Sequence, residues 1–64
     1  MVDGYYTVVT KELKALGFSY DSNAKGSHEK WRNAAGTILI VPRNLYSRHT
    51  AQAILKDAGS SKRL

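Results

Sequence analysis

A short stretch in the middle of the chain holds the residues whose types and spacing best suit chemistry. Residues 27–33 read Ser-His-Glu-Lys-Trp-Arg-Asn and alternate in character as a β-strand does. Neighbouring side chains of a strand point to opposite faces, so His28, Lys30 and Arg32 share one side. Trp31 is expected beneath helices, which turns this row toward the open side. There, cations can hold phosphate oxygens while an imidazole moves a proton, an arrangement that suits cleavage of a phosphodiester.

The same alternation weakens other arrangements. Ser27 and His28 are adjacent on the strand, so their side chains are not expected to meet as nucleophile and base, and Glu29 is on the wrong side to orient the imidazole. The strand histidine is therefore either catalytic or simply exposed and hydrogen-bonded. The preceding Lys25-Gly26-Ser27 lacks the glycines of a P-loop and is expected to form a turn, from which Lys25 can still touch phosphate.

Metal and cofactor chemistry are not expected. The sequence has two histidines, His28 and His49, with no cysteine and no tight group of Asp or Glu around them. The spacing of a three-ligand zinc site is therefore absent. The longest apolar run, 38–41, is far too short to cross a membrane, and the lack of cysteine fits a reducing compartment. We expect a soluble, cytoplasmic protein.

Positive charge is concentrated in the second part of the chain. The 64 residues carry ten Lys and Arg against five Asp and Glu, a net charge of +5, and residues 23–64 hold eight of these cations but two of the carboxylates. A polyanion such as RNA would contact mainly this part, although a basic surface also serves solubility. Arg48 opens the expected last helix, where it binds phosphate together with free N–H groups or is merely a tolerated surface charge.

The elements that position these residues follow from hydrophobic spacing. A first helix is predicted from apolar residues at helical intervals, namely Tyr5, Val9, Leu13 and Leu16. Asp3 can cap it and Gly17 can end it. A last helix, capped by Ser47 and stopped by Gly59, is predicted from a second apolar stripe, namely Ala51, Ile54, Leu55 and Ala58. Between them lie three predicted strands: 18–22, in which Phe18, Tyr20 and Ser22 alternate with polar residues, 27–33, and 37–41, ended by Pro42.

This order predicts an α+β domain in which a three-stranded antiparallel meander carries both helices on one face and leaves the other open. We expect a single domain over 1–64, with a core at about 5–59 and a frayed tail at 60–64. Ile38 and Ile40 face one way, and Leu39 and Val41 the other. Whichever set the helices cover, the other leaves an apolar strip outside, either as a docking site for a protein or because so small a domain cannot hide everything.

Several of these segments together resemble the HicA family of toxins over residues 5–59. The specific part is the Gly-Ser-His-x-x-aromatic motif at 26–31, supported by Gly-Phe at 17–18, the run at 38–42 and the segment at 53–59. The resemblance implies a double-stranded-RNA-binding-like αβββα fold and ribosome-independent cleavage of mRNA. It also implies that His28 is the catalytic strand histidine and that a HicB-like antitoxin neutralises the protein. Many relatives have a further histidine after the third strand, where Arg43 and Asn44 stand here.

The sequence thus leads to the hypothesis of a metal-independent endoribonuclease, the toxin of a toxin–antitoxin pair. His28 would be the general acid or base, and cations would contact RNA phosphates, namely Lys25, Lys30, Arg32 and Arg48. One alternative is a non-catalytic RNA-binding module of the same fold. Another is a protein-interaction domain whose charge is incidental.

Overall fold

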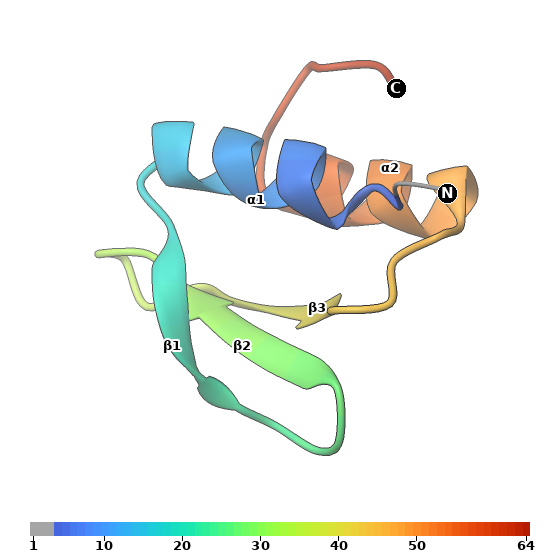
Figure 1. Cartoon of the computed structure of the whole chain (residues 1–64). Coiled ribbons are helices and arrows are strands. Elements are labelled where there is room, and N and C mark those ends of the chain that lie inside the picture. Colours follow the sequence, from blue (N-terminus) through green and yellow to red (C-terminus); the bar gives the residue numbers. More distant parts are fainter. Residues whose placement is uncertain (1–3) are drawn as a thin grey trace.

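Two helices cover one face of a three-stranded sheet and leave the other face open (Figure 1). The computed structural model describes residues 4–64. In chain order the elements are α1 (Tyr6–Ala15), β1 (Ser19–Asn23), β2 (His28–Arg32), β3 (Ile38–Pro42) and α2 (Arg48–Asp57). The strands lie in the order β1-β2-β3 and both pairs are antiparallel. The predicted αβββα fold is confirmed.

A glycine in the left-handed region of backbone conformation lies two residues beyond the last residue of each helix. Gly17 has φ 93° and Gly59 has φ 86°. Glycine adopts this conformation at little energetic cost because it has no Cβ. After α1, the Phe18 N–H donates to the carbonyl oxygen of Leu13 at 2.8 Å. After α2, the Ser60 N–H donates to the Leu55 carbonyl oxygen at 2.9 Å. These are the long hydrogen bonds of a Schellman motif, and they turn the chain sharply out of each helix.

The beginnings of the helices differ. Ser47 caps α2 as predicted, because its side-chain oxygen accepts a hydrogen bond from the Thr50 N–H at 3.2 Å. Tyr5 is the N-cap residue of α1 and makes no side-chain cap bond. Asp3, the cap expected from the sequence, lies outside the described residues. Each helix has ten residues, and no helix within residues 4–64 is long and apolar enough to cross a membrane.

The core lies between the helices and the sheet. On β3, Leu39 and Val41 face inward, whereas Ile38 and Ile40 remain 49% and 46% exposed on the open face. This settles which set the helices cover. Trp31 of β2 is 3% exposed, as its predicted inward position requires. The buried apolar side chains are Val9, Leu13, Phe18, Trp31, Leu39, Val41, Leu45, Ala51, Ile54 and Leu55.

The first strand departs from the prediction. It runs from Ser19 to Asn23 rather than over 18–22, and its register against β2 shifts between Tyr20 and Ser22. Tyr20 pairs with Trp31 and Ser22 pairs with Lys30, so Asp21 is the extra residue of a β-bulge. Because of this bulge Tyr20 faces the helices and Ser22 the open side, although the simple alternation predicted a common face.

The last five residues lie along the helices, on the side away from the sheet (Figure 1). The Ser60 hydroxyl donates to Glu12 Oε2 at 2.7 Å. The side-chain amide of Gln52 makes two hydrogen bonds to the backbone of the tail. Its Nε2 donates to the Lys62 carbonyl oxygen at 2.7 Å, and its Oε1 accepts from the Leu64 N–H at 2.9 Å. The segment has no helix or strand, and these bonds attach it to α1 and α2. The frayed tail expected from the sequence stays a prediction.

A pair of leucines in and just after α1 tests how far the stability depends on this core. Leu13 is 0% exposed and Leu16 is 37% exposed. We expect Leu13→Ala to lower the free energy of unfolding by about 2 to 5 kcal/mol, because it removes buried methyl groups and leaves a cavity. The matched Leu16→Ala change should cost less than about 1 kcal/mol. Urea unfolding followed by Trp31 fluorescence measures both, and equal losses would contradict the packing described here.

Candidate active site

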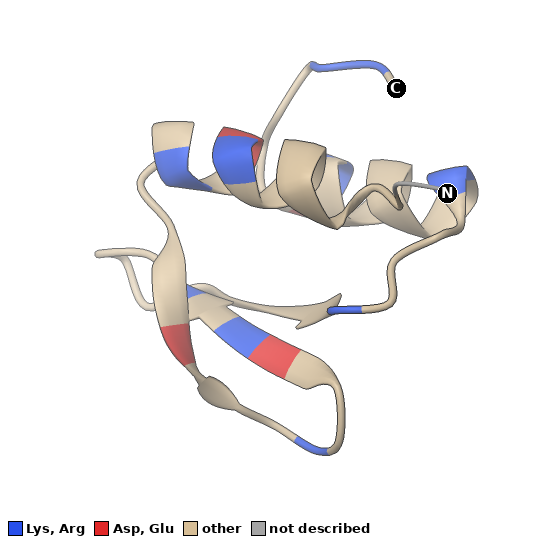
Figure 2. Cartoon of the chain, in the orientation of Figure 1, with Lys and Arg blue, Asp and Glu red and all other residues tan. Residues whose placement is uncertain are grey.

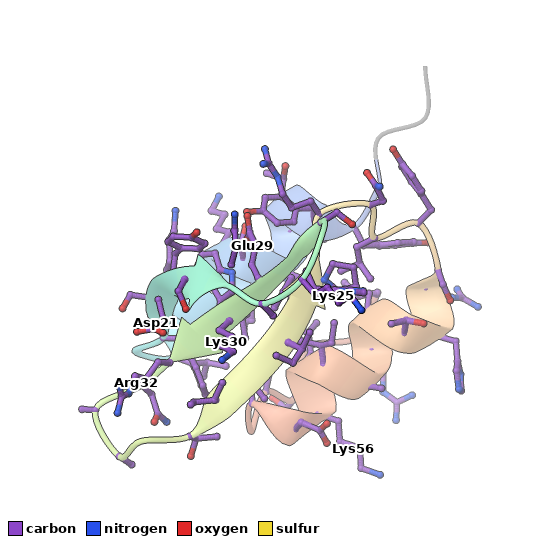
Figure 3. The ribbon with its side chains drawn as sticks, turned by 90° about the horizontal axis from the view of Figure 1, so that it is seen from below. Asp21, Lys25, Glu29, Lys30, Arg32 and Lys56 are labelled. Carbon is purple, nitrogen blue, oxygen red and sulfur yellow. The ribbon has the colours of Figure 1, made fainter. Side chains whose placement is uncertain are left out.

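The open face of β2 carries the row of side chains proposed from the sequence. His28 and Arg32 are exposed and Lys30 is half-buried, while Glu29 and Trp31, between them along the strand, are buried on the helix side. Figure 3 views the molecule from the sheet side, with Lys30 and Arg32 following one another along β2. The structure therefore brings His28, Lys30 and Arg32 together on one face, as the alternation predicted.

An apolar strip borders this row on β3. Lys30 pairs across the ladder with Ile40, and Arg32 pairs with Ile38. His28 pairs with Pro42 at the end of the same strand. Paired residues of an antiparallel sheet share a face, so the two exposed isoleucines lie directly beside the cations. Anything that covers the strip also covers part of the row.

Arg32 has a carboxylate neighbour on β1. Its Nη1 lies 4.0 Å from Asp21 Oδ1, and the two side chains are 57% and 38% exposed (Figure 3). The Ser22 hydroxyl donates to the other oxygen of Asp21 at 2.9 Å. A long, solvent-exposed ion pair of this kind stabilises the protein by about 1 kcal/mol or less. This ion pair therefore positions Arg32 within the row and leaves its guanidinium able to bind a phosphate.

Lys25 stands in the turn between β1 and β2, immediately before the row. The turn is closed by the His28 N–H, which donates to the Lys25 carbonyl oxygen at 3.0 Å, and by the Ala24 N–H, which donates to the His28 carbonyl oxygen at 2.9 Å. The Arg43 N–H donates to the Ser27 carbonyl oxygen at 2.8 Å and ties the turn to the end of β3. The predicted turn is confirmed, and it places an exposed lysine three residues before His28.

Arg48 lies elsewhere. It is exposed in the first turn of α2, where it borders a surface hollow together with His49, Gln52 and Arg63. This hollow adjoins the C-terminal tail, on the helix layer rather than on the open sheet. Figure 2 shows the resulting spread of Lys and Arg over the sheet, the turns, the start of α2 and the tail. Arg48 is thus not brought together with His28.

The helix side of β2 holds a buried carboxylate directly behind the row. Glu29 is 6% exposed, and its Oε1 accepts hydrogen bonds from the Tyr6 hydroxyl at 2.7 Å and from Trp31 Nε1 at 3.1 Å. Arg43 Nε lies 3.6 Å from Glu29 Oε2. Burying a carboxylate is unfavourable unless donors and an opposite charge surround it, and here all three groups do so. We call these four residues the Glu29 cluster.

The Glu29 cluster changes the acidity of its phenol. Burial and then the hydrogen bond to Glu29 raise the pKa of Tyr6 from 10.0 to about 12, and the carboxylate charge acts in the same direction. The cause is that ionised Tyr6 would be poorly solvated and would face a second negative charge. Tyr6 is therefore a fixed donor at neutral pH and holds the carboxylate in place.

The described residues offer little for metal binding. Within 4–64, no three side chains of His, Cys, Asp and Glu come together in a group able to hold a metal ion. The chemistry available on the open face is that of an imidazole, two strand cations and a lysine on the adjacent turn. Proton transfer and charge stabilisation at a phosphodiester match this set.

Comparison with known protein families bears on this arrangement. A family model described as the HicA toxin of bacterial toxin–antitoxin systems matches residues 8–60. The match spans most of α1, the whole sheet with His28, and α2. The chain belongs to the HicA toxin family. It is accordingly a toxin of the toxin–antitoxin type, as the sequence motif indicated. Comparisons with curated proteins and with solved structures give no match.

The sequence reasoning missed the Glu29 cluster. It placed Glu29 on the inner side with Trp31 but assigned it no partner. A carboxylate at an inward-facing strand position next to tryptophan is itself a signal, because such a charge requires donors. The identity of those donors, Tyr6 from α1 and Arg43 from beyond β3, depends on tertiary packing and has no local pattern.

The raised pKa of Tyr6 predicts a specific alkaline instability. Between pH 10 and about 12 the unfolded chain loses the Tyr6 proton while the folded protein keeps it. Since the folded state then binds more protons, the free energy of unfolding must fall as the pH rises through this range. Tyr6→Phe should make this fall shallower. Urea unfolding at several alkaline pH values measures it, with Tyr5→Phe as the matched control; identical pH slopes for wild type and Tyr6→Phe would refute the assignment.

Proposed function

We propose that this HicA-family toxin is a metal-independent endoribonuclease that cleaves mRNA, with His28 as general acid or base. The observation that carries the proposal is the exposed imidazole at the start of β2, on the same face as Lys30 and Arg32. Membership of a toxin family supports it, as does the Gly-Ser-His motif that ends at this residue. Action on mRNA would place the protein in the cytoplasm.

The proposed reaction is an internal transesterification. The ribose 2′-oxygen attacks the neighbouring phosphorus, the P–O5′ bond breaks, and the products are a 2′,3′-cyclic phosphate and a 5′-hydroxyl. The 2′-hydroxyl loses a proton and the leaving 5′-oxygen gains one. His28 performs one of these transfers, while Lys25, Lys30 and Arg32 stabilise the charge that builds on the phosphorane oxygens. DNA lacks the attacking group and should not be cut.

Arg48 would have a different part in this proposal. It lies in the first turn of α2 and borders the hollow beside the C-terminal tail rather than the open sheet, so we do not place it on the phosphate that His28 and Lys30 contact. We assign it to a phosphate farther along the RNA, where the backbone N–H groups at the start of α2 favour an anion. Its loss should weaken binding without changing the chemical step.

Replacement of the strand histidine tests the proposal. His28→Ala should lower the rate of RNA cleavage about 10²- to 10⁴-fold, because a proton-transfer group is lost, and should leave RNA binding nearly intact. His49→Ala is the matched control, since His49 borders the hollow beside the C-terminal tail, and should cleave like wild type. Cleavage of end-labelled RNA in EDTA, with a gel-shift assay beside it, measures both properties.

The outcomes of this experiment separate the candidate functions. Equal cleavage by wild type and His28→Ala would remove His28 from the mechanism. Tight binding of RNA that stays intact would indicate the non-catalytic RNA-binding module instead. Induction of both forms in a bacterial host extends the test, because growth arrest and loss of mRNA should follow only from the wild type.

We further propose a HicB-like antitoxin as the partner that covers the open face. Ile38 and Ile40 expose an apolar strip beside the cationic row. A partner with apolar and acidic side chains would bury this strip and neutralise Lys30 and Arg32 in one interface. His28 lies on the same face, so such a partner would also shield the proposed catalytic group.

The strip can be tested by truncating one isoleucine. Ile40→Ala should weaken binding of a co-expressed HicB-like protein about tenfold, the effect of removing most of a buried aliphatic side chain from an interface. Leu16→Ala is the matched control, because Leu16 is similarly exposed but follows α1 in the helix layer. Affinity measured by calorimetry decides. Failure of the HicB-like protein to co-purify or to relieve growth arrest would contradict the partnership.

A further inference from the structure

A groove lies on the helix side of the molecule, between α1 and the first two strands. Its volume is about 610 Å³, within the usual range of sites for small ligands. Tyr6 and Lys14 line it from α1, Tyr20 and Asn23 from β1, and Trp31 from β2. This is the face opposite to His28, and neither the cleavage mechanism nor the apolar strip uses it.

Two of the aromatic side chains that line the groove pack against each other. The Tyr20 ring meets Trp31 edge to face, with the centroids 6.3 Å apart and the planes at 79°. Trp31 is buried and fixed by its bond to Glu29, whereas Tyr20 is 49% exposed. The Tyr20 hydroxyl donates to Asn23 Oδ1 at 2.8 Å, which restrains the ring and leaves the amide N–H groups of Asn23 as donors for a ligand. A planar group can therefore pack against a ring that is already held in place.

Two cations stand at the edges of these aromatic walls. Lys14 Nζ lies 5.9 Å from the centroid of the Trp31 ring. Arg43, whose side chain is 66% exposed, lies beside Glu29 at the other side of the groove. Glu29 itself is almost inaccessible, and its Oε1 already accepts two hydrogen bonds. A ligand in the groove thus meets the exposed Tyr20 ring, amide donors and accessible positive charge.

We infer that this groove binds one unstacked nucleotide of the RNA strand whose scissile phosphate lies at His28. The inference rests on the proposed function. A base has a π-face to stack on Tyr20 and its flanking phosphates are anions for Lys14 and Arg43, so one ligand satisfies both features of the site. An apolar protein side chain would use the aromatic walls but not the cations.

The position of the groove fits a strand that continues from the cleavage site. Asn23 and Glu29 pair with each other at the end of the β1–β2 hairpin, on the groove side. His28 immediately precedes Glu29 in β2 and lies on the opposite face. The turn at 24–27, with exposed Lys25, joins the two faces. An RNA strand that passes over this turn would run from the His28 imidazole to the groove and would meet Lys25 where it passes from one face of the sheet to the other.

The test measures binding of a single-stranded RNA that carries a 2′-O-methyl group on every ribose. This probe lacks the attacking hydroxyl and cannot be cleaved. Loss of a stacking ring should raise the dissociation constant of Tyr20→Ala about tenfold or more. Tyr20→Phe, which keeps the ring and loses only the hydrogen bond to Asn23, should raise it much less. Tyr46→Ala is the matched control, because Tyr46 is 63% exposed in the loop before α2 and does not line the groove. Binding is followed through the fluorescence of the single tryptophan, Trp31.

A second pair of variants keeps the inference testable if Tyr20→Ala lowers the thermal unfolding midpoint. Lys14→Ala should weaken binding and reduce the slope of log K against log salt by about 1, the effect of one lost phosphate contact. Lys11→Ala, an exposed lysine of the same helix outside the groove, should leave the slope unchanged. Cut-site profiles on mRNA should shift for Tyr20→Ala if the groove reads a base, whereas a general structural defect would weaken all cuts equally.

The outcomes separate this inference from the proposed function. Unchanged binding by both Tyr20→Ala and Lys14→Ala overturns the groove even if wild type cleaves RNA normally. Binding that depends on Tyr20, with no cleavage of unmodified RNA by wild type, supports the groove and overturns only the nuclease. Weaker binding of a HicB-like protein to Tyr20→Ala, without any effect of this change on RNA binding, would assign the groove to the partner and overturn the inference.

Discussion

The inward position of Glu29 and Trp31 in β2 determines what both faces of the sheet can do. The two side chains are joined by a hydrogen bond of 3.1 Å and are both buried beneath the helices. Because successive side chains of the regular strand β2 point to opposite faces, their burial turns His28, Lys30 and Arg32 outward. A slip of one residue in register would expose the indole and bury two cations without partners. The open-face row is thus maintained by interactions on the opposite side of the same strand.

The Glu29 carboxylate also connects parts of the chain that are distant in sequence. Its donors come from α1, from β2 itself and from the segment after β3. A buried charge tolerates the loss of a partner poorly, so these elements must keep their relative positions for the carboxylate to stay satisfied. The cluster lies at the end of the sheet where β2 begins, and the Arg43 N–H also fixes the turn before His28. In a domain this small, one polar cluster can therefore restrain the helix, the turn and the strand around a candidate catalytic residue.

Periodicity was sufficient to predict the element order, the inward side of β2 and the caps at Ser47 and Gly59, because these depend on residues close in sequence. The bulge at Asp21 was not predictable in this way. It is defined by which residue of β2 lies opposite, and the segment 18–22 reads as a plain alternating strand. The attachment of the tail depends in the same manner on Gln52, ten residues before its first partner. The location of Arg48 away from His28 likewise depends on how α2 packs against the sheet. The spacing of residues within α2 gives no information about that packing.

The bulge has a further consequence for the two proposed RNA contacts. With the bulge, Tyr20 faces the groove and packs against Trp31, while Asp21 lies beside Arg32. One irregularity in β1 therefore places an aromatic ring on one face and a charge partner near the other. A partner that covers Ile38 and Ile40 would lie over β3 and the row, whereas the groove opens between α1 and β1. If both proposals hold, such a partner would stop cleavage by shielding His28 while the nucleotide groove stayed accessible. Inhibition would then act on the chemical step rather than on every contact with RNA, since the two surfaces lie on opposite sides of a single sheet.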